Sequence, residues 1–227
     1  MNVAVQIRIE PRRRASAWLA QMGVMGLMGL MGLAGCGSLL PKPAAAPALF
    51  LLEDASATTA DMLSKPALAA AASTLVVAEP RAAPGYGTRQ IAYVRTANQL
   101  EYFAFNQWVE PPALMLAPLL AHAIERTGAF RAVVRVPLSV AGDMRLETEL
   151  IRLHQDFSVT PSRVRLTVRA VLIDIATRRV LATREFDAQA VSASEDPAGG
   201  VMAANQAAQR VSAEVAAFCA GWANPSK

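Results

Sequence analysis

The sequence predicts an α+β fold: a largely antiparallel β-sheet with two main helices packed on one face. Two observations lead to this class. Residues 163–172 alternate charged or polar with apolar side chains, a period of two that is typical of a strand with one buried and one solvent-facing side. Residues 196–222 open with Asp-Pro and carry an apolar stripe at helical spacing, which predicts a long terminal helix.

The other strands follow from short apolar or β-branched runs between turn-forming residues. Such runs predict strands at 49–53, 73–80, 89–96, 99–108, 130–137, 144–157, 162–175 and 180–192. The run at 49–53 indicates a buried strand, and Ala97 and Asn98 suit the turn of a hairpin. Residues 81–87 indicate a turn-rich link, and 54–72, rich in Ala, Ser and Thr, indicates a loop or weak helix.

A first helix is predicted within residues 109–128. Pro111 and Pro112 suit its start and Gly128 its end. Pro118 interrupts the run, because proline lacks the backbone N–H that a helix interior uses. We therefore expect a kink there, or a first turn that forms a separate piece.

The N-terminus has the order of an export signal. A basic patch within residues 8–14 precedes an uncharged run over 15–35. The run is long enough to span a bilayer, so its length leaves a permanent membrane helix open. The residues Leu33, Ala34, Gly35 and Cys36 resemble the bacterial lipobox, which favours cleavage between Gly35 and Cys36. The alternative is a cysteine that falls by chance at the end of an ordinary signal or membrane helix.

This organisation divides the chain into a lipoprotein signal peptide (1–35), a lipidated cysteine with a Pro/Ala-rich tether (36–47) and a folded domain (48–224). The Cys36 thiol would carry diacylglycerol, with an amide-linked acyl chain such as palmitate on its amino group. Two or more chains hold a protein stably on a membrane. Because Gly37 and not Asp follows the cysteine, we expect the periplasm-facing inner leaflet of the outer membrane, with the inner membrane less favoured.

Charge and cysteine content exclude several classes of protein. The formal net charge of +4 falls to +1 once the four arginines and Glu10 of the signal are removed, so there is no nucleic-acid footprint. If Cys36 is acylated, Cys219 has no partner within the chain. Cys219 would then pack in a core or pair between molecules.

Catalytic and metal-binding signatures are missing from the sequence. His122 and His154 have no second ligand at metal-binding spacing, and surface or partly buried histidines fit better. There is no nucleophile elbow, dinucleotide fingerprint or P-loop. The sequence therefore predicts no enzyme and no cofactor beyond the covalent lipid, so energy for any transport must come from a partner.

Charged residues lie on the predicted solvent face of two strands. Glu147 and Glu149 share one face, and Arg163, Arg165 and Arg169 form a basic row on a neighbouring strand. Opposite-charge pairs across the strands are the favoured interpretation. The alternative is a basic stripe for anionic headgroups or an acidic partner.

The strand at 99–108 is unusually aromatic. It carries Tyr102, Phe103, Phe105 and Trp108, with apolar residues on both of its alternating sets. Core packing accounts for most of these rings. The alternative is that some face a partner protein, because aromatic residues are enriched at interface centres.

The stretch from residue 83 to 134 resembles the ABC-type transport auxiliary lipoprotein family, which includes the lipoprotein of the paraquat-inducible Pqi system. The resemblance rests on the IAYVR and LEYFAFNQW strands, the PP-initiated helix and GAFRAVV, followed by a strand hairpin and a terminal helix. It covers the mature chain beyond the tether and includes no catalytic signature. It matches least over 54–72.

This resemblance implies a non-catalytic accessory that works beside an ABC ATPase, a permease and a protein with a mammalian cell entry (MCE) domain. Together these would move lipids between the two membranes. The competing interpretations are a periplasmic carrier that binds one lipid itself, a periplasmic hydrolase with a dispersed active site, and a structural lipoprotein without a transport role. Whether the chain forms a homo-oligomer stays open.

Overall fold

The computed structural model describes residues 46–53, 73–136 and 141–223. Three long strands form the largest part of the sheet: β7 (Met144–Asp156), β8 (Arg163–Asp174) and β9 (Val180–Val191). β8 lies antiparallel between the other two. The predicted alternation is confirmed, because the inward side chains of β8 are at most 2% exposed: Val164, Leu166, Val168, Ala170 and Leu172.

The other edge of β7 is occupied in turn by three short strands, all parallel to it. These are β2 (Thr74–Val77), β3 (Arg81–Ala82) and β4 (Gln90–Val94). Beyond β2 lies β6 (Ala132–Arg135), also parallel. β5 (Leu100–Trp108) pairs with β4 as the predicted hairpin, and β1 (Ala48–Phe50) pairs parallel with β5 at the sheet edge. The sheet is thus antiparallel in its long strands and mixed at its short ones.

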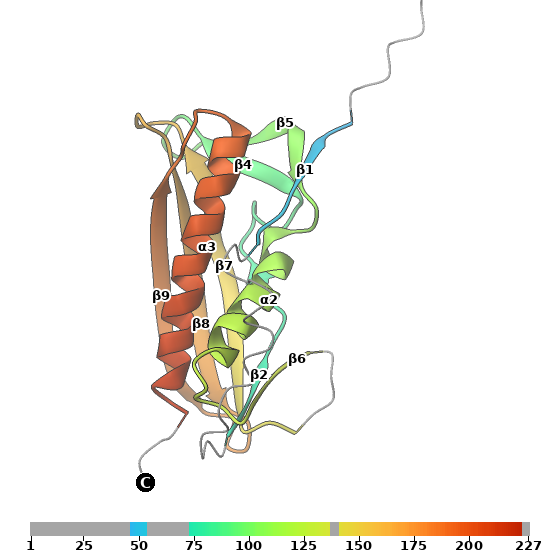
Figure 1. Ribbon diagram of the computed structural model, residues 1–227, viewed down its shortest axis with the longest axis vertical. Helices are drawn as coiled ribbons and strands as arrows, with labels where there is room; N and C mark the ends of the chain where they lie inside the picture. Colours follow the sequence, from blue (N-terminus) through green and yellow to red (C-terminus); the bar gives the residue numbers. More distant parts are fainter. Residues whose placement is uncertain (1–45, 54–72, 137–140, 224–227) are drawn as a thin grey trace, which may run out of the picture. The chain divides into compact units, whose positions relative to one another are not determined.

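Two helices cover one face of this sheet, as Figure 1 shows. α3 (Pro197–Ala220) packs on β8 and β9 and against α2 (Pro112–Glu125). The predicted N-terminus of α3 is confirmed, because the Asp196 carboxylate accepts a hydrogen bond from the Gly199 amide at 2.8 Å. The core lies between helices and sheet and includes Leu120, Leu150 and Leu166, none of them exposed.

The structure corrects the sequence predictions at three places. α2 runs unbroken through Pro118, so the prediction of a separate first turn is wrong. β3 forms within the stretch expected to be a turn-rich link, because it pairs with a segment of β7 far away in sequence. The run at 49–53 is not a buried strand throughout: Leu49 and Leu51 are 54% and 46% exposed, because β1 has only β5 as a neighbour.

Candidate interaction surfaces

The aromatic strand β5 divides into a buried, a half-buried and an exposed part. The Trp108 side chain is 2% exposed and packs in the core, so it is not available to a partner. The Phe103 ring is half-buried and lies 4.5 Å from the Tyr93 ring, centroid to centroid. The Tyr102 hydroxyl donates a hydrogen bond to the Gly85 carbonyl at 3.0 Å. Phe105, at 60% exposed, is the member that is open to solvent.

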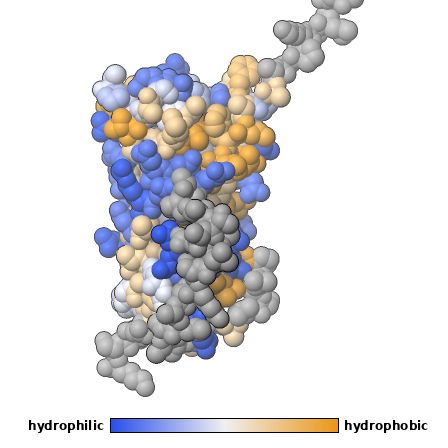
Figure 2. Space-filling model, viewed as in Figure 1, coloured by the Kyte–Doolittle hydropathy of each residue, from blue (hydrophilic) through white to orange (hydrophobic). Residues whose placement is uncertain are grey.

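Phe105 belongs to a small apolar surface that sequence reasoning missed. Leu49 pairs with Gln107, two residues beyond Phe105, so Leu49 and Phe105 lie on the same side of adjacent strands. Leu51 follows β1 and is also exposed. Figure 2 shows an apolar area on the side of the molecule where Figure 1 places β1 and β5. We call Leu49, Leu51 and Phe105 the β1–β5 apolar surface. No local signal in the sequence marks it, because the run at 49–53 has the pattern of a buried strand.

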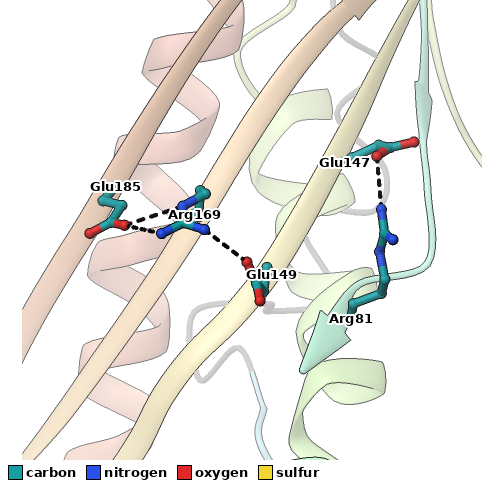
Figure 3. Close-up of polar contacts among 5 residues, drawn as sticks. All are labelled: Arg81, Glu147, Glu149, Arg169 and Glu185. Atoms are coloured by element: carbon teal, nitrogen blue, oxygen red, sulfur yellow. Dashed lines mark hydrogen bonds and ion pairs between the residues drawn. The ribbon is translucent and has the colours of Figure 1, made fainter. Parts of the chain in front are cut away.

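The outer face of the sheet carries a ladder of ion pairs, shown in part in Figure 3. Arg169 on β8 bridges Glu149 on β7 at 3.2 Å and Glu185 on β9 at 2.6 Å. Glu147 pairs instead with Arg81 on β3, at 3.0 Å. The predicted cross-strand pair of Glu149 and Arg169 is thus confirmed.

The rest of the basic row is also matched across β8 and β9. Arg165 lies 2.8 Å from the Asp187 carboxylate, and Arg163 contacts the Gln189 amide oxygen at 3.4 Å. Hydrogen bonds from Arg165 and Thr167 hold the pKa of Asp187 below its usual range, against the opposing effect of burial. Because the β9 carboxylates of Asp187 and Glu185 neutralise Arg165 and Arg169, the face is an ion-pair ladder more than a basic stripe for anions.

A groove of about 420 Å³ lies between the two helices. Its lining is mostly small or apolar and comes from both: Leu119, Ala123, Arg126 and Thr127 with Gln209, Ser212, Ala213, Ala216 and Ala217. Ser212 is 4% exposed, and its hydroxyl has no hydrogen-bond partner among the described residues. The chemistry of the groove is mainly apolar.

The histidines and Cys219 have structural surroundings. His154 is partly buried, and its Nδ1 lies 2.9 Å from the Tyr86 hydroxyl, while burial and the Arg152 charge lower its pKa to about 4. His122 is also partly buried, so the prediction for both rings is confirmed. Cys219 packs in the core as expected, and burial raises the pKa of its thiol to about 12. At neutral pH this thiol is protonated and inert.

Within the described ranges, no three His, Cys, Asp or Glu side chains come together as a metal site. Over the same residues, no helix combines the length and apolarity needed to cross a bilayer. The predicted cleavage site at Gly35 and lipidation site at Cys36 lie outside the described residues. What the described part offers is a set of surfaces: an apolar edge, a charged sheet face and an interhelical groove.

The family model for the ABC-type transport auxiliary lipoprotein component matches residues 52–216. The chain therefore belongs to this family, as the sequence pattern indicated. The match covers both helices nearly completely and the sheet from β2 to β9. Comparison with curated proteins gave no significant match.

Solved structures support the fold. A Xanthomonas campestris protein of the DUF330 family superposes with a TM-score of 0.63 at 24% identity, over 78% of this chain and 95% of that one. A second, uncharacterized protein gives a TM-score of 0.59 at 13% identity, over 77% and 99%. At these identities the likeness establishes the architecture alone.

Proposed function

We propose that this protein is a non-catalytic lipoprotein accessory of an MCE-type ABC transport system that moves lipids between the two membranes. The observation that carries the proposal is the family match over 52–216, taken together with the lipobox at 33–36. The accessory is anchored through acyl chains on Cys36 in the inner leaflet of the outer membrane and works by contact with the MCE-domain protein. The ATPase and permease supply the energy.

The anchor is tested by Cys36→Ser. Serine has no thiol to take up diacylglycerol, so we expect an unprocessed precursor that incorporates no labelled palmitate. Gel mobility, palmitate labelling and membrane pelleting of parent and variant are compared. A variant that is shortened to mature size and pellets as the parent does would refute the anchor.

We infer that the MCE-domain protein contacts the half-buried aromatic part of β5, around Tyr102 and Phe103. Both rings are half-buried and combine apolar area with limited side-chain freedom, which suits an interface. As consecutive residues of β5 they point to opposite faces of the strand, so each would offer its own contact. Trp108, the fourth predicted residue, would support the strand from the core.

A photoreactive amino acid at Phe103 tests this contact in cells, with Thr183 on β9 as the exposed control position. We expect an adduct with the MCE-domain protein from Phe103 and none from Thr183. If neither Tyr102 nor Phe103 yields an MCE adduct while other proteins are captured equally from both strands, the contact lies elsewhere.

A lipid carrier is the second candidate, and the groove between α2 and α3 is the observation that favours it. Its volume of about 420 Å³ lies within the usual range of ligand cavities, roughly 300–1,000 Å³. A carrier would retain about one lipid per chain after purification. Mass spectrometry under native conditions that detects no retained lipid would remove this candidate.

A further inference from the structure

The β1–β5 apolar surface exposes three large side chains at one edge of the sheet. Phe105 is 60% exposed, Leu49 54% and Leu51 46%. Clustered apolar groups cost free energy in water, and such a cluster marks a contact with a membrane or a protein. The other apolar residues of comparable exposure lie on other elements: Val180 and Val191 at the two ends of β9, and Met202 on α3.

The position of this surface along the chain indicates what covers it. The described chain begins at Ala46, two residues before β1. Ala46 lies ten positions after Cys36. A fully extended chain spans at most about 3.6 Å per residue, or roughly 35 Å over this distance. With lipid on Cys36, β1 is the first described element after the anchor. Leu49 is thirteen positions from Cys36, so its backbone is held within roughly 47 Å of the anchor.

Holding β1 near the bilayer through the lipid anchor would strengthen an otherwise weak contact between the domain and the membrane. Once one end of a chain is fixed, a second contact becomes intramolecular and is governed by the effective concentration that the tether sets. Three partly exposed side chains would give only marginal membrane binding on their own, as a single acyl chain does. Beside a lipid anchor the same side chains can hold one edge of the domain against the membrane.

We propose that the β1–β5 apolar surface rests on the lipid bilayer, with Leu49, Leu51 and Phe105 at the boundary between headgroups and acyl chains. The proposal rests on the lipid anchor of the proposed function. It adds an orientation: the edge formed by β1 and β5 meets the membrane. The partner contact around Phe103 would then lie close to the membrane surface, because Phe103 and Phe105 are two residues apart on β5.

The test uses the full lipidated protein in vesicles of phosphatidylethanolamine and phosphatidylglycerol. An environment-sensitive fluorophore is placed on Phe105→Cys, with Val180→Cys as the control because Val180 is 59% exposed. Cys219 is not exposed at all and does not compete for the label. We expect blue-shifted emission at position 105 and at least three-fold stronger quenching by spin-labelled lipid than at position 180.

Adding Leu49→Ser and Leu51→Ser to the labelled Phe105→Cys protein should lower that quenching at least two-fold, while the vesicles still carry the protein. Equal, water-like emission at 105 and 180 on protein that floats with vesicles would overturn this proposal alone. A blue shift at position 105 without quenching by spin-labelled lipid would also overturn it. If that shift grows with protein concentration or on addition of the MCE-domain protein, the surface contacts protein and not lipid. Failure of the parent to float with vesicles would overturn the anchor and this proposal together.

Discussion

At the scale of single residues, a close approach between α3 and the sheet depends on Gly200. A β-carbon at this position would lie 2.2 Å from the Gln155 side-chain oxygen. Gln155 is 2% exposed, and its amide nitrogen donates hydrogen bonds to the Ser162 and Ser192 hydroxyls at 3.0 and 3.2 Å. The start of α3 can therefore pack over this polar cluster because position 200 has no side chain.

We expect Gly200→Ala to destabilise the fold by about 2 kcal/mol, since an extra methyl group in a packed site forces neighbours to move. Chemical denaturation of the purified protein measures the change. Gly221→Ala is the matched control: the nearest atom to its β-carbon would be 3.5 Å away, and φ is −62°. An alanine at 200 that is tolerated as well as one at 221 would contradict this account of the contact.

His154 couples the stability of the fold to pH. Burial, with a smaller contribution from the Arg152 charge, lowers its pKa from 6.5 to about 4. The native state therefore keeps the ring neutral in a range where the unfolded chain already binds a proton. The contribution of His154 to the free energy of unfolding is therefore fully present above pH 6.5, and it is lost as the pH falls toward 4.

Replacing His154 with Gln should remove this pH dependence, because glutamine does not titrate and its amide can still meet the Tyr86 hydroxyl. Since the ring is partly solvated, we expect the parent to lose about 1–2 kcal/mol between pH 6.5 and 4.5 through this group. Urea denaturation at several pH values measures the difference. An unchanged slope in the variant would show that other groups dominate the window.

At the scale of elements, α2 tolerates a proline that its sequence pattern argued against. Pro118 lies in the interior of the helix and is exposed. The helix continues because Leu116 and Leu120, on either side of it, are almost completely buried against the core. Tertiary packing here outweighs the local preference of the backbone.

Pro118→Ala should therefore stabilise the protein, by about 1–3 kcal/mol, because alanine restores the missing backbone donor without disturbing the core. Thermal unfolding followed by circular dichroism measures the gain. Pro112→Ala provides the comparison: Pro112 starts the helix, where a missing donor costs little, so no gain is expected. A loss of stability in Pro118→Ala would imply a packing role for the ring.

At the scale of the whole molecule, residues 51–53, which follow β1, are hydrogen-bonded to α3, the C-terminal helix. The Glu53 amide donates a hydrogen bond to the Asn205 side chain at 2.9 Å, across 152 positions of sequence. The Asn205 amide group in turn donates to the Leu51 carbonyl at 3.4 Å. This pair of contacts holds residues 51–53 against α3.

Asn205→Ala should release that segment while the core stays intact. We expect faster amide exchange at Glu53 and through β1, at least ten-fold, with a change in global stability below about 1 kcal/mol. Hydrogen exchange read by mass spectrometry measures this, and Gln209→Ala, one helical turn further on, serves as the control. Unchanged exchange in Asn205→Ala would mean that the pairing of β1 with β5 holds the segment by itself.

Sequence reasoning reached the elements whose signals are local. The alternation in β8 predicted its buried face, and Asp196 with Pro197 predicted the start of α3. Sequence reasoning failed where a strand or side chain pairs with residues far away in the sequence. Nothing local distinguishes β3 from a turn, and nothing near Arg165 in sequence reveals that Asp187 pairs with it.

The candidate surfaces show the same division. The sequence by itself determined that β5 is rich in aromatic residues, that the domain lacks a recognisable catalytic motif and that residues 33–36 resemble a lipobox. Only the tertiary structure decided that Trp108 lies in the core while Phe105, with Leu49 and Leu51, faces outward. The physical reason is that burial depends on which strands and helices lie alongside a residue, and an edge strand such as β1 has a neighbour on one side only.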